Sequence, residues 1–267
     1  MTSSHLSYYV RFFFITGFIA LSPSLLFAQA EWSELKGDHF IIYYQSDEPF
    51  AHEMLRKSEE YYKRIGEELG YERYSDFWQW DNRVKIYIYA TQEEFLKATG
   101  RQNWSHGVAD YTKKEISSYV WKEGFLESLL PHEITHLIFR DYVGFEGEIP
   151  LWLDEGVAQW QESAKRPIVK EAMRNALSKG KGYNLKDLTE IDIRTVSYAP
   201  AVELFYIQAM SVVDFLIKKK GSDVFIFFCR QLRDGKSMDE ALKFTYPTSI
   251  RSLNELEEQW RQYILSG

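Results

Sequence analysis

The order of apolar and polar positions predicts strands and a helix in the first part of the chain. Residues 39–44 (HFIIYY) are β-branched and aromatic, which is typical of a buried strand. Residues 50–69 carry apolar side chains at helical spacing, and Gly70 stands where such a helix would end. Residues 84–89 (VKIYIY) alternate strictly, as in a half-buried strand. The chain therefore begins with a β-α-β order.

The period then changes from strands to helices. Residues 107–111 and 116–121 predict two extended segments joined by a turn, which we expect at a sheet edge. The next apolar positions predict a helix that is N-capped by Ser128 and closed by Gly144, and a second helix that starts at Pro150. After residue 167 the pattern is almost entirely helical. The expected helices cover residues 167–178, 201–219, 223–233, 238–245 and 252–264.

One continuous domain is expected over residues 31–267, because no internal repeat and no Gly/Ser-rich or Pro-rich linker divides the chain. Residues 31–127 form its α/β part, residues 128–164 a pair of helices, and residues 165–267 a helical part. The predicted fold class is therefore α+β, with a small N-terminal mixed sheet followed by a mostly helical C-terminal half.

The charge balance argues against a nucleic-acid partner. Lys and Arg number 32 against 39 Asp and Glu, for a formal net charge of -7, and no block of basic residues occurs. This chain lacks the basic patch on which nucleic-acid binding depends. The single cysteine, Cys229, has no partner for an internal disulfide.

Residues 1–30 read as a signal peptide. They contain one Arg and no Asp or Glu, an apolar run from Phe12 to Phe27, and then Ala28-Gln29-Ala30, which suggests cleavage after Ala30. The predicted location is periplasmic or extracellular, with no membrane span after cleavage. The alternative is an uncleaved anchor, although sixteen apolar residues fall short of the roughly 20 that span a bilayer.

The pattern H-E-x-x-H occurs at His132-Glu133-Ile134-Thr135-His136. Residues four apart lie on one face of a helix, so both imidazoles are able to reach a single zinc ion while Glu133 projects beside them. A catalytic zinc needs a third protein ligand and one open position.

The second helix offers that third ligand in W-L-D-E-G, where Glu155 follows His136 after eighteen residues. Asp154 is the rival, because it points about 100° away on the same helix and only one of the two is able to face the metal. Gly156 beside Glu155 leaves space for another helix to come close, which favours a site built by two helices.

H-E-I-T-H with the spaced Glu of W-L-D-E-G resembles the gluzincin metallopeptidases, in particular their peptidase MA-like domains. The resemblance implies a zincin-like fold with an edge strand over the zinc helix, and a Zn²⁺ ion held by His132, His136 and Glu155. It also implies that Glu133 assists the attack of zinc-bound water on a peptide bond. Residues 107–111 resemble the edge strand that binds peptide substrates by strand addition. The G-A-M-E-N motif of the aminopeptidases is absent, which favours an endopeptidase.

Two more residues are candidates for the same site. Tyr206, in Y-I-Q-A-M-S, stands where related enzymes often place a tyrosine that faces the metal, and it is our candidate for stabilising the oxyanion. The alternative for Tyr206 is a core aromatic. Gln159 lies one turn past Glu155 and either orients a zinc-bound histidine or is a polar surface residue.

Three functions are open at this point. The first is an exported zinc peptidase that acts on peptides or proteins. The second is a catalytically inactive domain of the same fold that binds envelope proteins or peptides without cleaving them. The third is zinc-dependent hydrolysis of a non-peptide amide. The complete set of catalytic residue types in the motif favours the peptidase.

Overall fold

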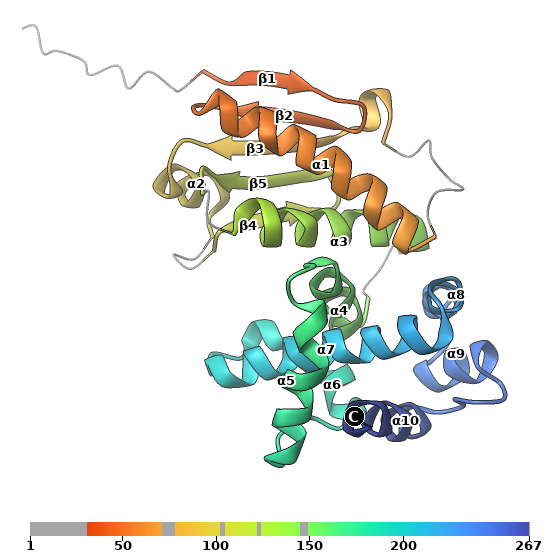
Figure 1. Cartoon of the computed structure of the whole chain (residues 1–267). Coiled ribbons are helices and arrows are strands. Elements are labelled where there is room, and N and C mark those ends of the chain that lie inside the picture. The colour runs from red at the N-terminus through yellow and green to blue at the C-terminus, as the bar shows by residue number, and fades with distance from the viewer. Residues whose placement is uncertain (1–30, 71–77, 102–104, 122–123, 145–148, 267) are drawn as a thin grey trace, which may run out of the picture. The chain divides into compact units, whose positions relative to one another are not determined.

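A mixed β-sheet with helices on it forms the N-terminal half of the chain, and a group of helices forms the C-terminal half (Figure 1). The computed structural model describes residues 31–70, 78–101, 105–121, 124–144 and 149–266. Residues 32–267 make up one unit that is separate from residues 1–31. The predicted signal segment, residues 1–30, lies outside the described residues.

The sheet has five strands in the order β1-β2-β3-β5-β4. Their bounds are β1 Ser33–Lys36, β2 Phe40–Tyr44, β3 Val84–Tyr89, β4 Gly107–Asp110 and β5 Glu115–Tyr119. The three central strands are parallel, and β1 and β4 pair antiparallel at the two edges. The register places Ile42 opposite Ile86 and Ile86 opposite Ile116, all three with no exposed surface. This row of isoleucines forms the base of the core under the helices.

Two helices lie side by side against this sheet. α1 (Glu48–Glu68) packs on β2, and α3 (Leu130–Val143) contacts both α1 and the edge strand β4 (Figure 1). Met54 on α1 and Ile134 on α3 are fully buried in the same core as Ile86. The short helix α2 (Gln92–Thr99) packs against β5 and β3. Burial of the apolar side of α3 fixes the orientation of that helix, and therefore also the direction in which its polar residues point.

The second half consists of α4 to α10, of which α7 is the central helix. Their bounds are α4 Leu151–Gln161, α5 Arg166–Ser178, α6 Leu185–Glu190, α7 Ala199–Lys220, α8 Ser222–Arg233, α9 Met238–Thr245 and α10 Leu253–Leu265. α7 contacts α4, α5, α8 and α10. In the part of the chain that the structure describes, α7 is the one helix long and apolar enough to cross a membrane, and 56% of that stretch is buried in the fold. The apolar sequence of α7 is therefore accounted for by its place in the core.

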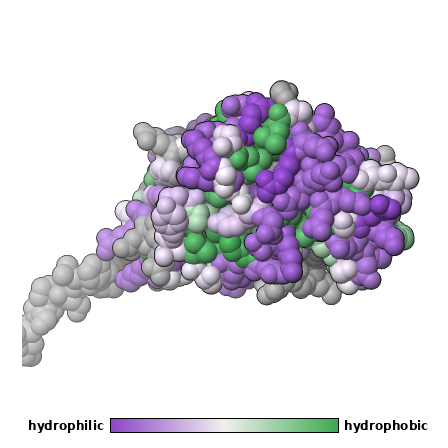
Figure 2. Space-filling view, turned by 90° about the horizontal axis from the view of Figure 1, so that it is seen from below, coloured by the Kyte–Doolittle hydropathy of each residue, from purple (hydrophilic) through white to green (hydrophobic). Residues whose placement is uncertain are grey.

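Seen from the helical side, the surface is mostly hydrophilic with separate apolar patches (Figure 2).

The structure confirms most of the expected elements, adds two that were not expected and corrects the expected cap of one helix. The first strand, β1, and the six-residue helix α6 had no clear pattern in the sequence. Ser128 does not cap α3: a π-helical turn over Phe125–Leu129 leads directly into this helix. That turn begins after Gly124, whose φ of 86° lies in the left-handed region that glycine adopts without strain.

Gly156 does allow a close helix contact, but the partner is α7 and not the histidine-bearing α3. A Cβ atom at Gly156 would lie 2.7 Å from the backbone oxygen of Ala209 and 2.8 Å from Val213 Cγ2. Since one of these atoms belongs to the backbone, α4 and α7 would have to move apart to admit a methyl group. Gly156 thus allows α4, the helix that carries Glu155, to pack closely against the central helix α7.

We expect Gly156→Ala to lower the free energy of unfolding by about 1–3 kcal/mol, the usual cost of forcing extra atoms into a packed core. The better helix propensity of alanine, worth about 1 kcal/mol, offsets part of this cost. Urea unfolding followed by circular dichroism measures the change. Asn175→Ala, at an exposed position of α5, is the control that raises propensity without a clash. Equal stability of Gly156→Ala and the wild type would contradict the close α4–α7 contact.

Candidate metal centre

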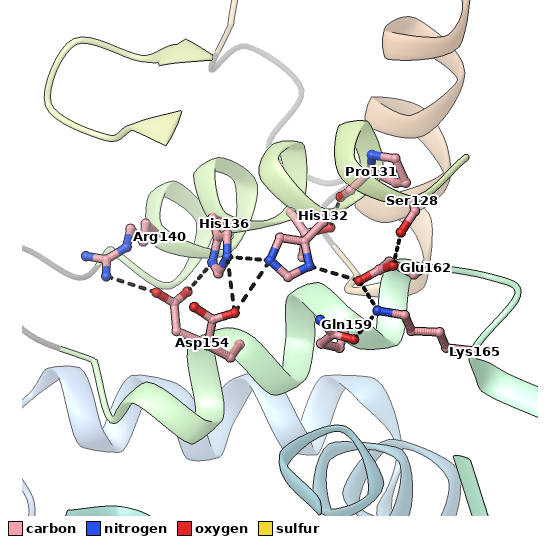
Figure 3. Close-up of polar contacts among 11 residues, drawn as sticks. Ser128, Pro131, His132, His136, Arg140, Asp154, Gln159, Glu162 and Lys165 are labelled. Atoms are coloured by element: carbon pink, nitrogen blue, oxygen red, sulfur yellow. Dashed lines mark hydrogen bonds and ion pairs between the residues drawn. The ribbon is translucent and has the colours of Figure 1, made fainter. Parts of the chain in front are cut away.

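Three potential metal ligands converge between α3 and α4. His132 and His136 project from successive turns of α3 toward α4 (Figure 3). Their Nε2 atoms are 3.2 Å apart, and Glu155 Oε2 on α4 lies 3.5 Å from Nε2 of His132 and 3.9 Å from Nε2 of His136. All three side chains offer one ligand atom within 4.8 Å of the others. The two helices therefore bring together the three residues that the sequence pattern predicts.

The other ring nitrogen of each histidine is held by a carboxylate. Nδ1 of His136 donates to Asp154 Oδ1 at 2.9 Å, and Nδ1 of His132 donates to Glu162 Oε1 at 3.1 Å (Figure 3). A hydrogen bond at Nδ1 fixes both the tautomer and the ring orientation, and it increases the basicity of Nε2. Both Nε2 atoms are thus directed into the shared space beside Glu155.

Each of these carboxylates is itself anchored. Asp154 also accepts a hydrogen bond from Arg140 at 3.0 Å. Glu162 accepts from Lys165 at 2.8 Å and from the hydroxyl of Ser128 (Figure 3). Asp154 and Glu162 are 4% and 3% exposed, so the two imidazoles are oriented by buried, fully engaged acids. Such support holds ligands in place before an ion arrives.

The electrostatics of the cluster favour a cation. Burial alone would lower the pKa of His132, but the hydrogen bonds with Glu155 and Glu162 outweigh it and raise that pKa to about 10. Burial would raise the pKa of Glu155, but the adjacent imidazoles outweigh burial and lower it. The pKa of Glu162 is lowered in the same way, by His132 and Lys165. Carboxylates that stay ionised around two imidazoles create a negative potential in which positive charge is stabilised.

Zinc fits this arrangement. Four-coordinate zinc with bonds of about 2.0–2.2 Å to nitrogen and oxygen places its ligand atoms about 3.3–3.6 Å apart. The observed separations of 3.2, 3.5 and 3.9 Å among the Nε2 atoms of His132 and His136 and the Oε2 atom of Glu155 are close to those of such a tetrahedron. Two imidazoles and one carboxylate are also a donor set of catalytic zinc sites, which leave one position open.

Glu133 lies next to the cluster of His132, His136 and Glu155. Within the described residues, no hydrogen bond or ion pair holds its carboxylate. Burial raises the pKa of Glu133, while His132 and His136 act in the opposite direction. A carboxylate that is desolvated, unengaged and beside a metal site is suited to accept a proton.

Two tyrosines flank the cluster from different elements. The pKa of Tyr206, on α7, is raised by burial and by the charges of Glu155 and Glu133, so these two acids lie near enough for their charges to act on its phenol. Tyr111, which follows β4, has its pKa raised by burial and by three acids that include Asp154 and Glu133. The ring of Tyr111 lies 5.9 Å from that of His136 and 4.2 Å from the guanidinium of Arg140. Sequence reasoning assigned Tyr111 only to the edge strand.

The residue that orients His132 is Glu162 and not Gln159, the sequence candidate. Gln159 instead accepts a hydrogen bond from Lys165 at 2.5 Å. A signal for Glu162 was present, because it lies seven residues after Glu155 and positions two turns apart share a helix face. Asp154, the rival ligand in the sequence argument, holds the far nitrogen of His136. Asp154 and Glu162 thus each hold the Nδ1 atom of one imidazole, and of these three acids Glu155 alone lies at the Nε2 atoms.

Two histidines and a glutamate, presented by two helices with their orienting acids, form a candidate mononuclear metal site of the kind found in metal-dependent hydrolases. The chain belongs to the Peptidase MA superfamily, since the model of that family matches residues 78–266. The match contains both metal-site helices and the edge strand β4. Peptidases of this clan are metal-dependent.

A search of curated proteins found none that matches the chain. The family is thus identified by the family model alone.

Proposed function

We propose that the protein is an exported zinc-dependent metallopeptidase of the gluzincin type, with His132, His136 and Glu155 as its zinc ligands. The observation that carries the proposal is the convergence of two histidine Nε2 atoms and one glutamate oxygen, with each imidazole fixed at Nδ1 by a buried carboxylate. Membership of the Peptidase MA superfamily supports hydrolysis of peptide bonds as the reaction.

Each of the chain's own residues at the site has a separate role in the proposed hydrolysis. When bound, zinc supplies a water that is activated at neutral pH and polarises the scissile carbonyl. Glu133 takes the proton of the attacking water and passes it to the leaving amine. Tyr206 donates a hydrogen bond to the oxyanion that develops on the carbonyl oxygen. Asp154 and Glu162 keep the imidazoles in position throughout.

The edge strand β4 is the proposed support for a peptide substrate. It lies at one edge of the described sheet, where it pairs with β5 on one side and with no other described strand on the other side. Tyr111, at the end of β4, contacts Arg140 and faces His136, so a peptide added along β4 would run toward the metal centre. Main-chain pairing of this kind grips the middle of a chain, which supports an endopeptidase.

Export to the periplasm or the extracellular space is part of the proposal and is supported by the residue order of segment 1–30. Peptides and proteins of that compartment are the proposed substrates.

The proposal is tested with denatured casein, incubated with the purified protein and analysed for new termini by mass spectrometry. We expect internal cleavages that a chelator abolishes and added zinc restores. Retention of casein by the zinc-loaded protein without any new terminus would contradict the peptidase and favour the non-cleaving binding domain.

A further inference from the structure

A mostly apolar pocket of about 390 Å³ opens between α5 and α7. Its walls include Val169 and Ala172 from α5 and Ile207 and Met210 from α7. Ile168, also a wall residue, is 61% exposed, so apolar surface continues out to the mouth of the pocket. The volume lies within the range of about 300–1,000 Å³ that small ligand sites occupy.

The pocket adjoins the metal centre. Tyr206, on whose phenol the charges of Glu155 and Glu133 act, also forms part of the pocket wall. Gln159 and Lys165 are wall residues as well, and both lie beside the acid that orients His132 (Figure 3). A substrate held at the metal would therefore have one of its side chains within reach of the pocket.

Apart from the hydroxyl of Tyr206, the polar groups of the pocket wall are already engaged or lie at its edge. The ammonium of Lys165 is bound by Glu162 and by Gln159. The third polar residue, Glu203, is exposed. A buried polar side chain would find few partners here and would lose its hydration, whereas an apolar one gains by leaving water.

We propose that this pocket receives a bulky apolar side chain of the peptide, such as Leu, Ile, Met or Phe, next to the bond that is cleaved. The inference rests on the proposed function for its substrate, a peptide. It assigns the choice of substrate to helices α5 and α7, which carry none of the zinc ligands.

The test measures peptide binding separately from cleavage. A randomised octapeptide library is passed over immobilised, zinc-loaded Glu133→Gln protein, and the retained peptides are sequenced by mass spectrometry. We expect bulky apolar residues to be enriched about tenfold at one aligned position, the discrimination that an apolar pocket provides. The same library is cleaved by the wild type, and the residues beside each new terminus are counted.

Ala172→Phe fills the pocket and should remove the apolar enrichment in both measurements. Ala176→Phe, one turn further along α5, faces a neighbouring hollow and is the matched control, with enrichment unchanged. Ile168→Asp, at the exposed mouth, weakens the preference without touching the core, so it tests the pocket even if Ala172→Phe does not fold.

The outcomes separate the two proposals. Apolar enrichment that Ala172→Phe abolishes, without cleavage by the wild type, supports the pocket and contradicts the peptidase. Cleavage or retention with no apolar preference, retention of no peptide, or a preference that survives both Ala172→Phe and Ile168→Asp would overturn the pocket.

Discussion

Glu133→Gln should reduce kcat for peptide hydrolysis by about 100-fold to 10,000-fold, the usual contribution of a positioned acid-base group. The metal content of the variant should equal that of the wild type. Glutamine keeps the shape of the side chain but cannot accept the proton of the attacking water. Since no hydrogen bond or ion pair holds Glu133 among the described residues, the substitution breaks no structural contact.

Steady-state hydrolysis of a peptide that the wild type cleaves, together with zinc analysis of both proteins, measures this effect. Tyr206→Phe is a useful comparison, because it removes one hydroxyl beside the site and leaves the base in place. We expect it to lower kcat with little change in KM, as loss of an oxyanion donor does. Equal hydrolysis by the wild type and Glu133→Gln would contradict the assigned role of Glu133.

His136→Ala should abolish both metal binding and hydrolysis. It removes one of three ligands and leaves Asp154 paired with Arg140 alone. We expect the zinc affinity to fall by more than about 100-fold, since replacing even an outer partner of a ligand typically costs 10–100-fold. Competition with a fluorescent zinc chelator measures the affinity.

Asp154→Asn is the matched control for this prediction, because it weakens the support behind His136 and keeps the ligand itself. Its zinc affinity should fall by about 10–100-fold, between the wild type and His136→Ala. Equal zinc affinities of the Asp154→Asn and His136→Ala variants would contradict the geometry of the centre.

The fold was predictable where the apolar pattern is strong. Residues 84–89 alternate along their whole length, and they form β3 with alternating burial. The edge strand β1 gave no such signal, because Ser33, Glu34 and Lys36 are exposed and only pairing with β2 makes them a strand. The six residues of α6 are too few for a helical period to emerge.

The site was predictable where its chemistry follows helical spacing. His132 and His136 share a face of α3, and of the two adjacent acids Glu155 alone lies at their Nε2 atoms, as the angle between Asp154 and Glu155 required. The partner of His132 was missed, because Glu162 reaches it from the residue that ends α4 and not from the expected turn. The placement of Gly156 against α7 depended on tertiary packing that no local pattern records.

The most direct test of the account is the metal content per chain of the purified protein beside that of Glu155→Ala. Glu155 is the one ligand contributed by α4, so the comparison tests whether the two helices build one centre. We predict about one zinc per wild-type chain, as expected for a single site of three protein ligands, and a large loss in the variant. No zinc in the wild type after reconstitution, or equal zinc in both proteins, would contradict the account.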